Sequence, residues 1–323
     1  MNLIERLFKF YINSSLHIAV SVVSLCFITT HTFEISFAKN LKWFIFFASV
    51  LGYNYIKYFG ISKFYYRSLT NKLKEIQTLS GLCFLGVCVS FFGLNTATKL
   101  IVLFLGAVTF FYEIPFEKVE SLRKVRGLKI YIIALVWSLT TVLLVVVNAG
   151  IDIDTKVLLK LFERFIFVFV LMLPFEIRDL DLDDIRLSTI PQKIGIVKTK
   201  QLGFFGLFLI ELLELFIFKQ PKAVVVLTTF IMLVTAFLIL KTPVKRNIYY
   251  AAFWVEAVPV LWASLIWFFL RFKQDQRVLK ALYLRPIFRE SFYKGPPDSQ
   301  SHPDLKYVFE DLKRLWDQTA VWF

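Results

Sequence analysis

Long apolar runs separated by short polar segments are the main pattern along this chain. The runs lack the alternation of apolar and polar positions that is typical of strands in a membrane barrel. A helix of about 20 apolar residues crosses the hydrocarbon layer and satisfies its own backbone hydrogen bonds. We therefore expect an all-α integral membrane protein, a bundle of nine transmembrane helices over residues 11–30, 41–59, 78–94, 99–115, 129–148, 157–176, 202–218, 223–240 and 248–270.

The composition agrees with this class of protein. Hydrophobic residues make up 57% of the 323 residues and charged residues 19%, and the mean hydropathy is +0.64. The three cysteines, Cys26, Cys83 and Cys88, all lie in apolar runs. We interpret them as small packing residues, because their spacing fits neither a disulfide framework nor a zinc site.

The net charge of +14 is distributed in a way that argues against nucleic-acid binding. Basic residues gather in alternate loops, within residues 57–74, 118–126, 193–200 and 241–246, whereas the opposite loops are short and less basic. Binding to nucleic acid requires a continuous basic surface. The pattern instead follows the positive-inside bias, which places the N-terminal residues 1–10 and the basic loops in the cytoplasm.

A basic tail, residues 271–323, follows the expected transmembrane domain of residues 11–270. After the break at residues 295–297, residues 304–316 carry apolar side chains at helical spacing and charges on the other face. This pattern predicts an amphipathic helix that contacts membrane lipids or a protein partner. Nine spans place the tail outside, against the charge bias, so either the tail lies along an anionic lipid surface or the span count is off by one.

Carboxylates cluster where the sixth apolar run ends, in the segment PFEIRDLDLDDIRLSTIPQKIG of residues 174–195. If the helix continues past Phe175, then Glu176, Asp179 and Asp183 are spaced at i, i+3 and i+7 and share one face. Charges at a membrane boundary are costly unless they pair, bind a cation or reach water.

Two interpretations of this acidic cluster stay open at the level of the residues. Three like charges on one helix face favour a bound divalent cation, and a site made only of oxygen ligands suits Mg²⁺. The alternative is a solvated helix end whose acids are neutralised by Arg178 and Lys193.

The string RDLDLDDIRLSTIPQKIG resembles the second aspartate motif of the UbiA family of membrane prenyltransferases, R-D-x-x-x-D followed by a T-x-P-x-x-x-G return. In that family the motif lies between spans six and seven of a nine-helix bundle, as it does here. Tyr112 at the end of span four and the segment LRKVRGLK of residues 122–129 agree further. The resemblance covers roughly residues 10–270.

The resemblance implies transfer of a prenyl group from an isoprenyl diphosphate to a lipophilic acceptor, usually an aromatic compound or quinone precursor, with the polar site facing the cytoplasm of a bacterial inner membrane. Asp179 and Asp183 then correspond to the catalytic, Mg²⁺-linked carboxylates, and Glu176 to a position often occupied by Asn or Asp. The candidate substrate-binding residues are Asn54, Lys57, Tyr58, Tyr112, Lys118, Arg123, Lys129 and Arg178.

The first aspartate motif of the family is degenerate in this chain. Alignment of GYNYIKYFGIS on Asn54 places Tyr55, Tyr58 and Ser62 where three aspartates belong. Neutral phenols are poor ligands for a hard cation, and Lys57 can neutralise a phosphate directly. Three interpretations follow: a one-metal enzyme, a relative acting on another prenyl-like lipid, or a non-catalytic member that binds an isoprenoid lipid or a protein partner.

Three further acids lie within the apolar runs, where an unpaired carboxylate is costly. We expect Glu211, Glu214 and Glu256 to be paired or to face a cavity. Glu256 either lines the binding chamber or pairs across the bundle, and the sequence does not decide between these two roles.

Overall fold

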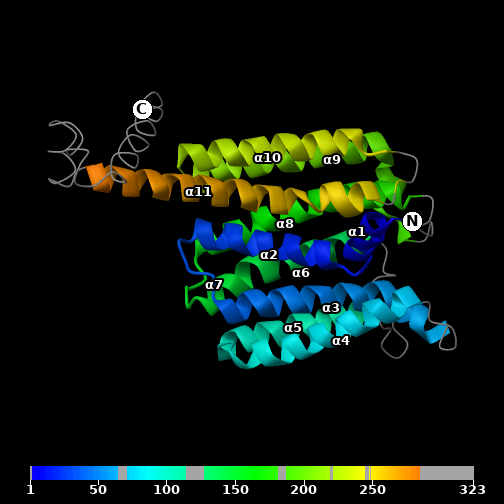
Figure 1. Ribbon diagram of the computed structural model, residues 1–323. Helices are drawn as coiled ribbons and strands as arrows, with labels where there is room; N and C mark the ends of the chain where they lie inside the picture. Colours follow the sequence, from blue (N-terminus) through cyan, green and yellow to red (C-terminus); the bar gives the residue numbers. More distant parts are fainter. Residues whose placement is uncertain are drawn as a thin grey trace. The chain divides into compact units, whose positions relative to one another are not determined.

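The computed structural model describes residues 2–64, 71–113, 127–180, 187–218, 221–243, 247 and 249–283, and all regular structure within these ranges is helical (Figure 1). Each of the nine expected segments is helical over its described part, apart from short breaks and end residues. Four described helices are long and apolar enough to cross a membrane, and a bent pair raises this number to five. The all-helical membrane class is therefore supported, whereas the count of nine spans is not confirmed.

The chain divides into two compact units, residues 1–264 and 265–323. In the second unit the described residues are the end of helix α11 (Val258–Tyr283), which continues past the expected limit at residue 270. The predicted amphipathic helix 304–316 lies outside the described residues, so the division of the tail and its lipid or protein contacts stay predictions.

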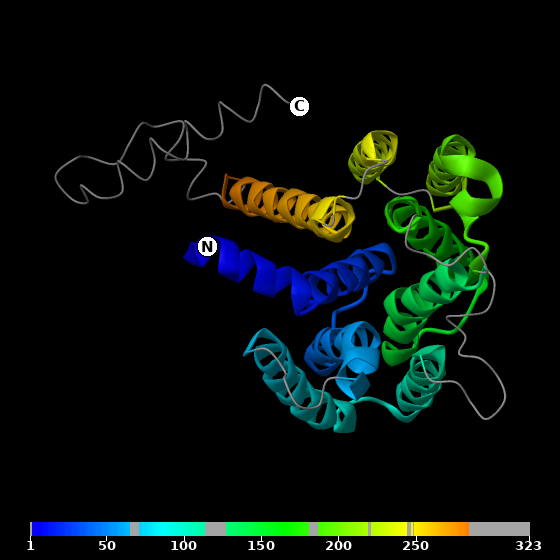
Figure 2. The same ribbon diagram turned by 90° about the vertical axis from the view of Figure 1, so that its right-hand side faces the viewer.

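The larger unit begins with helices α1 and α2, whose axes differ in direction by 58°. The bend lies at Ser15, whose φ of 63° is in the left-handed region. Helix α3 packs against α2 on one side and α4 on the other (Figures 1 and 2). The bounds are α1 (Leu3–Asn13), α2 (Leu16–Thr32), α3 (Lys39–Phe64), α4 (Asn71–Phe92) and α5 (Thr96–Glu113).

The second half of the larger unit is organised around α8 (Thr155–Arg178), which packs against both α6 and α9. Among the described residues of this half, the π-helical segments η2 and η4 continue α6 and α9, and η5 comes shortly before α11. Such segments are rare and frequently occur at functional sites. The remaining bounds are α6 (Lys129–Ser138), η2 (Leu139–Leu143), α7 (Leu144–Asn148), α9 (Ile190–Leu213), η4 (Glu214–Phe218), α10 (Lys222–Lys241) and η5 (Tyr250–Val255).

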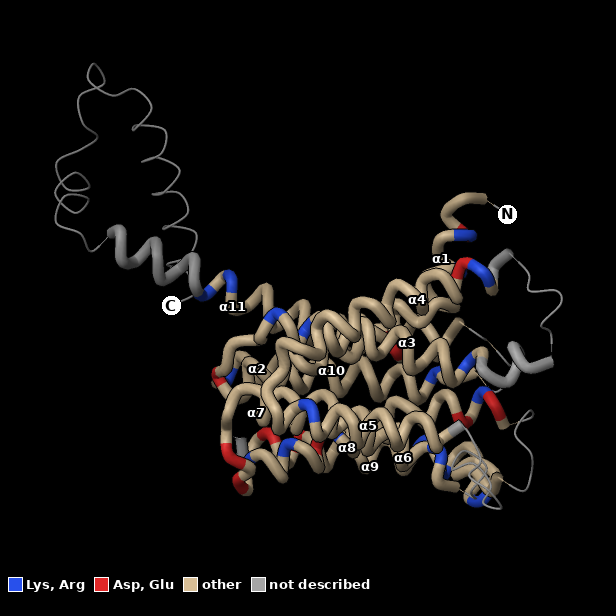
Figure 3. The backbone as a smooth tube through the Cα atoms, turned by 90° about the horizontal axis from the view of Figure 1, so that it is seen from below, with Lys and Arg blue, Asp and Glu red and all other residues tan. Residues whose placement is uncertain are grey.

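Charged residues lie mainly toward the two ends of the helices, and long uncharged stretches separate them (Figure 3). Large apolar side chains on the outer helices are exposed, among them Val89, Phe92, Phe205 and Val226. Extended exposed apolar surface is expected where lipid, rather than water, surrounds a protein.

Helices α8 and α9 approach each other closely at Gly206. A Cβ atom at this position would lie 2.6 Å from Val170 Cγ2 and 3.3 Å from Ile166 Cγ2. On α5, by contrast, a Cβ atom at Gly106 would meet nothing within 4 Å. Glycine at position 206 therefore permits the contact that holds α9 against α8.

We predict that Gly206→Ala lowers the stability by about 1–3 kcal/mol, because the added methyl group overpacks the interface. Gly106→Ala is the matched control, and it should be neutral or stabilising by up to about 1 kcal/mol, since Ala is the better helix former. Thermal unfolding in detergent, followed by circular dichroism, measures both. Equal unfolding midpoints for the two variants would contradict the proposed close contact.

Candidate functional site

The second aspartate motif begins at the last turn of α8. The helix ends at Arg178, with Asp179 as its C-cap residue, so the face expected to carry Asp183 stops short of that residue. Arg178 holds the Asp179 carboxylate bidentately, with Nε donating to Oδ1 at 2.7 Å and Nη2 to Oδ2 at 2.8 Å. Its guanidinium also lies 5.0 Å from the centre of the Phe175 ring. Two parallel charge-assisted hydrogen bonds fix the orientation of both groups.

Glu176, one turn earlier, is buried and lies 3.4 Å from Lys129 Nζ through its Oε1 atom. Lys129 is the first residue of α6, so this ion pair joins the beginning of α6 to the end of α8. Two residues that the sequence placed in one site, an acid and a candidate diphosphate partner, are therefore in direct contact.

The loops before α6 and α9 lie side by side. The Gly127 N–H donates to the Leu187 carbonyl at 2.8 Å, and Gly127 has a φ of 69° that favours glycine. Thr189 then begins α9 with a capping box, in which its N–H donates to Gln192 Oε1 at 2.8 Å. The T-x-P return of the motif thus starts the next helix next to the Lys129–Glu176 pair.

Asn54, the remaining polar residue of the first motif, is buried on α3. Its amide Nδ2 donates to Ser80 Oγ on α4 at 3.0 Å, and its Oδ1 has no hydrogen-bond partner among the described residues. The side chain therefore joins α3 to α4 and has one acceptor to spare.

Lys57 and Tyr58 on α3 reach the end of α1. Tyr58 donates its hydroxyl hydrogen to the Asn13 carbonyl at 2.9 Å, and Lys57 Nζ lies 3.5 Å from the Ile12 carbonyl. The Lys57 residue is exposed, so part of its side chain keeps surface outside the contact with α1.

Lys57, Arg178 and Glu256 converge from three parts of the chain. Their side chains are close enough for the charge of Glu256 to interact with both cations. Glu256 follows η5, is only 8% exposed, and accepts a hydrogen bond through its main-chain carbonyl from Ser21 Oγ. The sequence indicated a chamber-lining or paired role for Glu256, and the structure places it beside two predicted substrate-binding residues.

An imidazole and two aromatic side chains lie next to these charges. His17 contacts the Tyr11 hydroxyl through Nδ1 and the Phe253 carbonyl through Nε2, both at 3.0 Å. Its ring stacks on that of Phe253, with a centroid separation of 5.2 Å. The break between α1 and α2 is thereby attached to η5.

A second aromatic group comes from α3, α5 and α6. Trp137 Nε1 donates to the Tyr53 hydroxyl, and Tyr53 is close enough to interact electrostatically with both Tyr112 and Glu256. Tyr112, a predicted site residue, is buried. Sequence reasoning missed Tyr53 and Trp137, because an aromatic residue in an apolar run carries no signal that separates a site from ordinary packing.

The predicted magnesium ligands are only partly within the described residues. Asp183, Lys118 and Arg123 lie outside them, and among the described residues no three His, Cys, Asp or Glu side chains gather into a possible metal site. Glu176 and Asp179 each already contact a cationic side chain. The described residues alone therefore do not make up a complete Mg²⁺ site, because Asp183 lies outside them.

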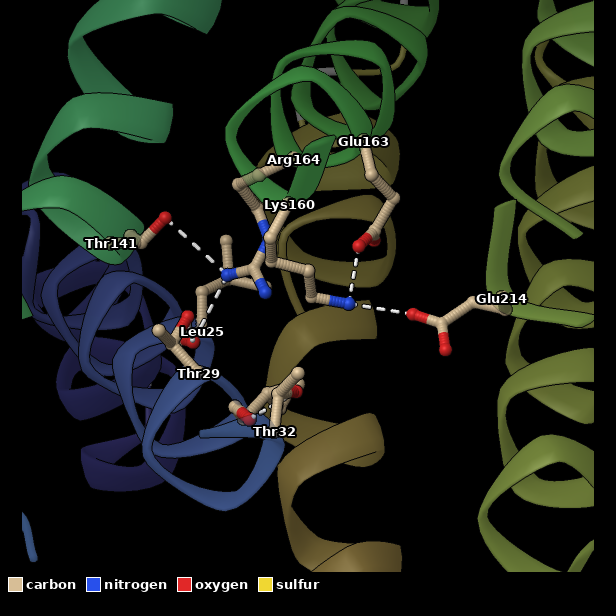
Figure 4. A network of polar contacts seen from close by, with 9 residues as sticks. Leu25, Thr29, Thr32, Thr141, Lys160, Glu163, Arg164 and Glu214 are labelled. Carbon is tan, nitrogen blue, oxygen red and sulfur yellow. Dashed lines mark hydrogen bonds and ion pairs between the residues drawn. The ribbon is translucent and has the colours of Figure 1, made fainter. Parts of the chain in front are cut away.

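A second polar cluster is buried in the first half of α8 (Figure 4). Lys160 contacts Glu163 on the same helix, and its Nζ lies 2.6 Å from Glu214 Oε1 at the start of η4. Arg164 Nη1 donates to the Leu25 carbonyl at 3.0 Å. None of the four charged side chains is more than 3% exposed.

This cluster, defined as Lys160, Glu163, Arg164 and Glu214, is separate from the motif. Lys160 precedes Arg178 by roughly 27 Å along a straight helix. The cluster joins α8 to three neighbouring elements. Lys160 contacts Glu214 of η4, and Arg164 donates both to the Leu25 carbonyl of α2 and, at 3.3 Å, to Thr141 Oγ1 of η2. We interpret the cluster as a structural junction.

Comparison with known proteins supports the fold. No family model and no curated protein matches the sequence. Among solved structures, a UbiA homolog from Aeropyrum pernix K1 in its apo form has a TM-score of 0.60 at 14% identity, over 79% of this chain and 98% of its own. A structure of digeranylgeranylglyceryl phosphate synthase in membranes has a TM-score of 0.49 at 16% identity, over 81% of this chain and 98% of its own. The chain has the UbiA fold, so the resemblance carried by its second motif is confirmed at the level of the fold.

We predict that Lys160→Met destabilises the protein by about 3–5 kcal/mol, because it leaves two carboxylates buried without their cation. Replacing Glu163 and Glu214 by Leu in the same chain should recover most of this loss, since it removes those carboxylates. Arg6→Met, which breaks the exposed Arg6–Glu75 ion pair, is the control, and its cost should stay below about 1 kcal/mol. Unfolding midpoints in detergent measure all three, and a Lys160→Met midpoint equal to that of the control would contradict the junction.

Proposed function

We propose that this chain is a membrane prenyltransferase of the UbiA type, which transfers a prenyl group from an isoprenyl diphosphate to a lipophilic acceptor. The observation that carries the proposal is the convergence of Lys57 and Arg178 at the end of α8 where the second aspartate motif begins. Both cations are available beside an apolar helical interior, which is what a ligand with a charged head and a hydrocarbon tail requires.

The proposed chemistry follows from these charges. A leaving diphosphate gains negative charge as the allylic carbon–oxygen bond breaks, and fixed cations stabilise it without rearrangement. Arg178 is held in position by Asp179, so its guanidinium is oriented before the substrate binds. The tail of the donor would lie among apolar side chains that keep water away from the reacting carbon.

Magnesium belongs to this proposal as an expectation from the family resemblance. Asp179 and Asp183, with Glu176, are the residues proposed to hold it, and the ion would supply additional positive charge to the diphosphate. Lys57 then takes over part of the role of the aspartates that the first motif lacks. The acceptor is proposed to be aromatic or a quinone precursor, and the site to face the cytoplasm of a bacterial inner membrane, as the basic loops indicate.

A second candidate function is non-catalytic binding of an isoprenoid lipid or of a protein partner. Three contacts favour it: Asn54 binds Ser80, while Glu176 and Asp179 each contact a cation. Carboxylates engaged in this way have fewer free oxygen atoms for a metal ion. The two functions differ in whether the protein releases diphosphate.

We predict that the purified protein in lipid nanodiscs releases diphosphate from farnesyl or geranylgeranyl diphosphate when Mg²⁺ and a lipid-soluble phenolic acceptor are present. Asp179→Asn combined with Asp183→Asn should lower the rate on the order of 100-fold. The variant loses the carboxylates proposed to hold Mg²⁺ and to orient Arg178, so the positive charge that stabilises the leaving diphosphate is weakened. Asp152→Asn, an exposed acid outside the motif, is the control and should leave the rate unchanged. A double variant with the wild-type rate would refute the role of the motif, and co-purified isoprenoid without turnover would favour the binding protein.

We predict that Lys57→Ala weakens binding of the isoprenyl diphosphate by about tenfold or more, since a hydrogen bond to a charged group contributes about 1.5–3 kcal/mol. Lys74→Ala removes an exposed lysine from α4 and should leave the affinity unchanged. Equilibrium binding of tritiated farnesyl diphosphate measures both variants. Equal affinities would remove Lys57 from the donor site.

A further inference from the structure

Glu256 is a buried residue, 8% exposed, directly after η5. Its main chain is fixed, because its N–H donates to the Ala251 carbonyl at 3.2 Å and its carbonyl accepts from Ser21 Oγ. Within the described part of the chain, its carboxylate makes no hydrogen bond and no ion pair within 4.0 Å. A buried acid without such partners is costly, and acids inside membrane domains are typically functional.

Four ionisable side chains from three helices lie near enough to this carboxylate to interact with it electrostatically. Lys57 and Arg178 act on it as cations, and Tyr11 and Tyr53 place phenol groups near it. The two cations are the groups proposed to hold the diphosphate, so Glu256 would lie near that end of a bound donor. It is attached to the bundle by Ser21 of α2 rather than through its own side chain.

The other described acids at this end of α8 are already engaged. Asp179 accepts two hydrogen bonds from Arg178, and Glu176 contacts Lys129. The first motif contributes no carboxylate, because Tyr55 and Tyr58 stand at aspartate positions. Of the described acids near Lys57 and Arg178, Glu256 is the one whose carboxylate makes no hydrogen bond or ion pair within the described residues, so both of its oxygen atoms can accept a proton.

We propose that Glu256 is the catalytic base of this site, an inference that rests on the proposed prenyl transfer. The bond between the prenyl C1 atom and the diphosphate oxygen breaks, and its electron pair leaves with the diphosphate toward Lys57 and Arg178. The nucleophilic atom of the acceptor forms a bond to C1. The proton that the acceptor then loses passes to the Glu256 carboxylate, which becomes a neutral carboxylic acid and later returns the proton to water.

This role separates Glu256 from the residues that bind the donor. A base acts on the acceptor, so its loss should slow the transfer step and leave the affinity for the diphosphate intact. A residue with only a structural role would alter folding or donor binding instead. The donor affinity and the transfer rate are therefore measured separately on the same preparation.

The test uses the full chain in phosphatidylcholine nanodiscs, with tritiated farnesyl diphosphate as donor and para-hydroxybenzoate as acceptor. Glu256→Gln should keep the affinity for farnesyl diphosphate within about threefold while the single-turnover transfer rate falls about 100-fold or more. Glu256→Asp keeps a carboxylate and should retain a rate between those of the wild type and Glu256→Gln. Glu211→Gln, the matched loss of an acid that binds Thr229 on α10, should leave both quantities unchanged.

Each outcome decides the inference. A folded Glu256→Gln variant with the wild-type transfer rate overturns it, as does one whose loss of rate is matched by loss of donor affinity. If Glu256→Gln does not fold, the test uses a folded Glu256→Asp variant. An unchanged transfer rate with unchanged donor affinity overturns the inference, whereas a lower transfer rate with unchanged donor affinity supports it. A wild-type protein that binds farnesyl diphosphate and transfers nothing removes the proposed function and this inference with it, a result distinct from an active Glu256→Gln variant.

Discussion

Charges that helices carry into an apolar interior must be satisfied by other parts of the same chain, and α8 meets this constraint at both of its ends. Near its beginning, Lys160 binds carboxylates from its own helix and from η4. At its end, Glu176 binds the first residue of α6. Because an unpaired charge in hydrocarbon costs several kcal/mol, these contacts help to hold η4 and α6 beside α8.

The two polar centres of α8 differ in how accessible their charged groups are. In the cluster of Lys160, Glu163, Arg164 and Glu214, the lysine contacts both carboxylates and every charged side chain is buried. At the other end, Lys57 keeps accessible surface and the Glu256 carboxylate has no partner among the described residues. The first cluster also contains buried polar atoms without a hydrogen-bond partner, such as Arg164 Nε and Nη2, so the two centres differ chiefly in whether a charged group keeps surface that a ligand can reach. This difference is why the proposed chemistry belongs to the second centre.

Degeneration of the first aspartate motif changes how such a site can be built. Phenols at positions 55 and 58 cannot replace carboxylates as ligands of a hard cation. The fold brings other groups to the same region, namely the ammonium of Lys57 and the carboxylate of Glu256, which come from helices far apart in the sequence. In the function proposed for this chain, Lys57 and Arg178 would bind the phosphate and Glu256 would accept the proton without carboxylates from the first motif.

The apolar runs, the end of α8 near Arg178 and the start of α9 at the T-x-P return could be predicted from the sequence, because hydrophobic periodicity and turn chemistry are local properties. The helical segments appear close to the predicted positions, while the number of membrane spans is not confirmed, because four or at most five of the described helical segments are long and apolar enough to cross a membrane. Only the tertiary structure showed that Lys129 contacts Glu176, that Asn54 binds Ser80, and that Glu256 lies beside Lys57 and Arg178. The physical reason is that the partner of a buried polar or charged group is set by which helices pack together, and these helices can be far apart in the sequence, as Lys57 and Glu256 are.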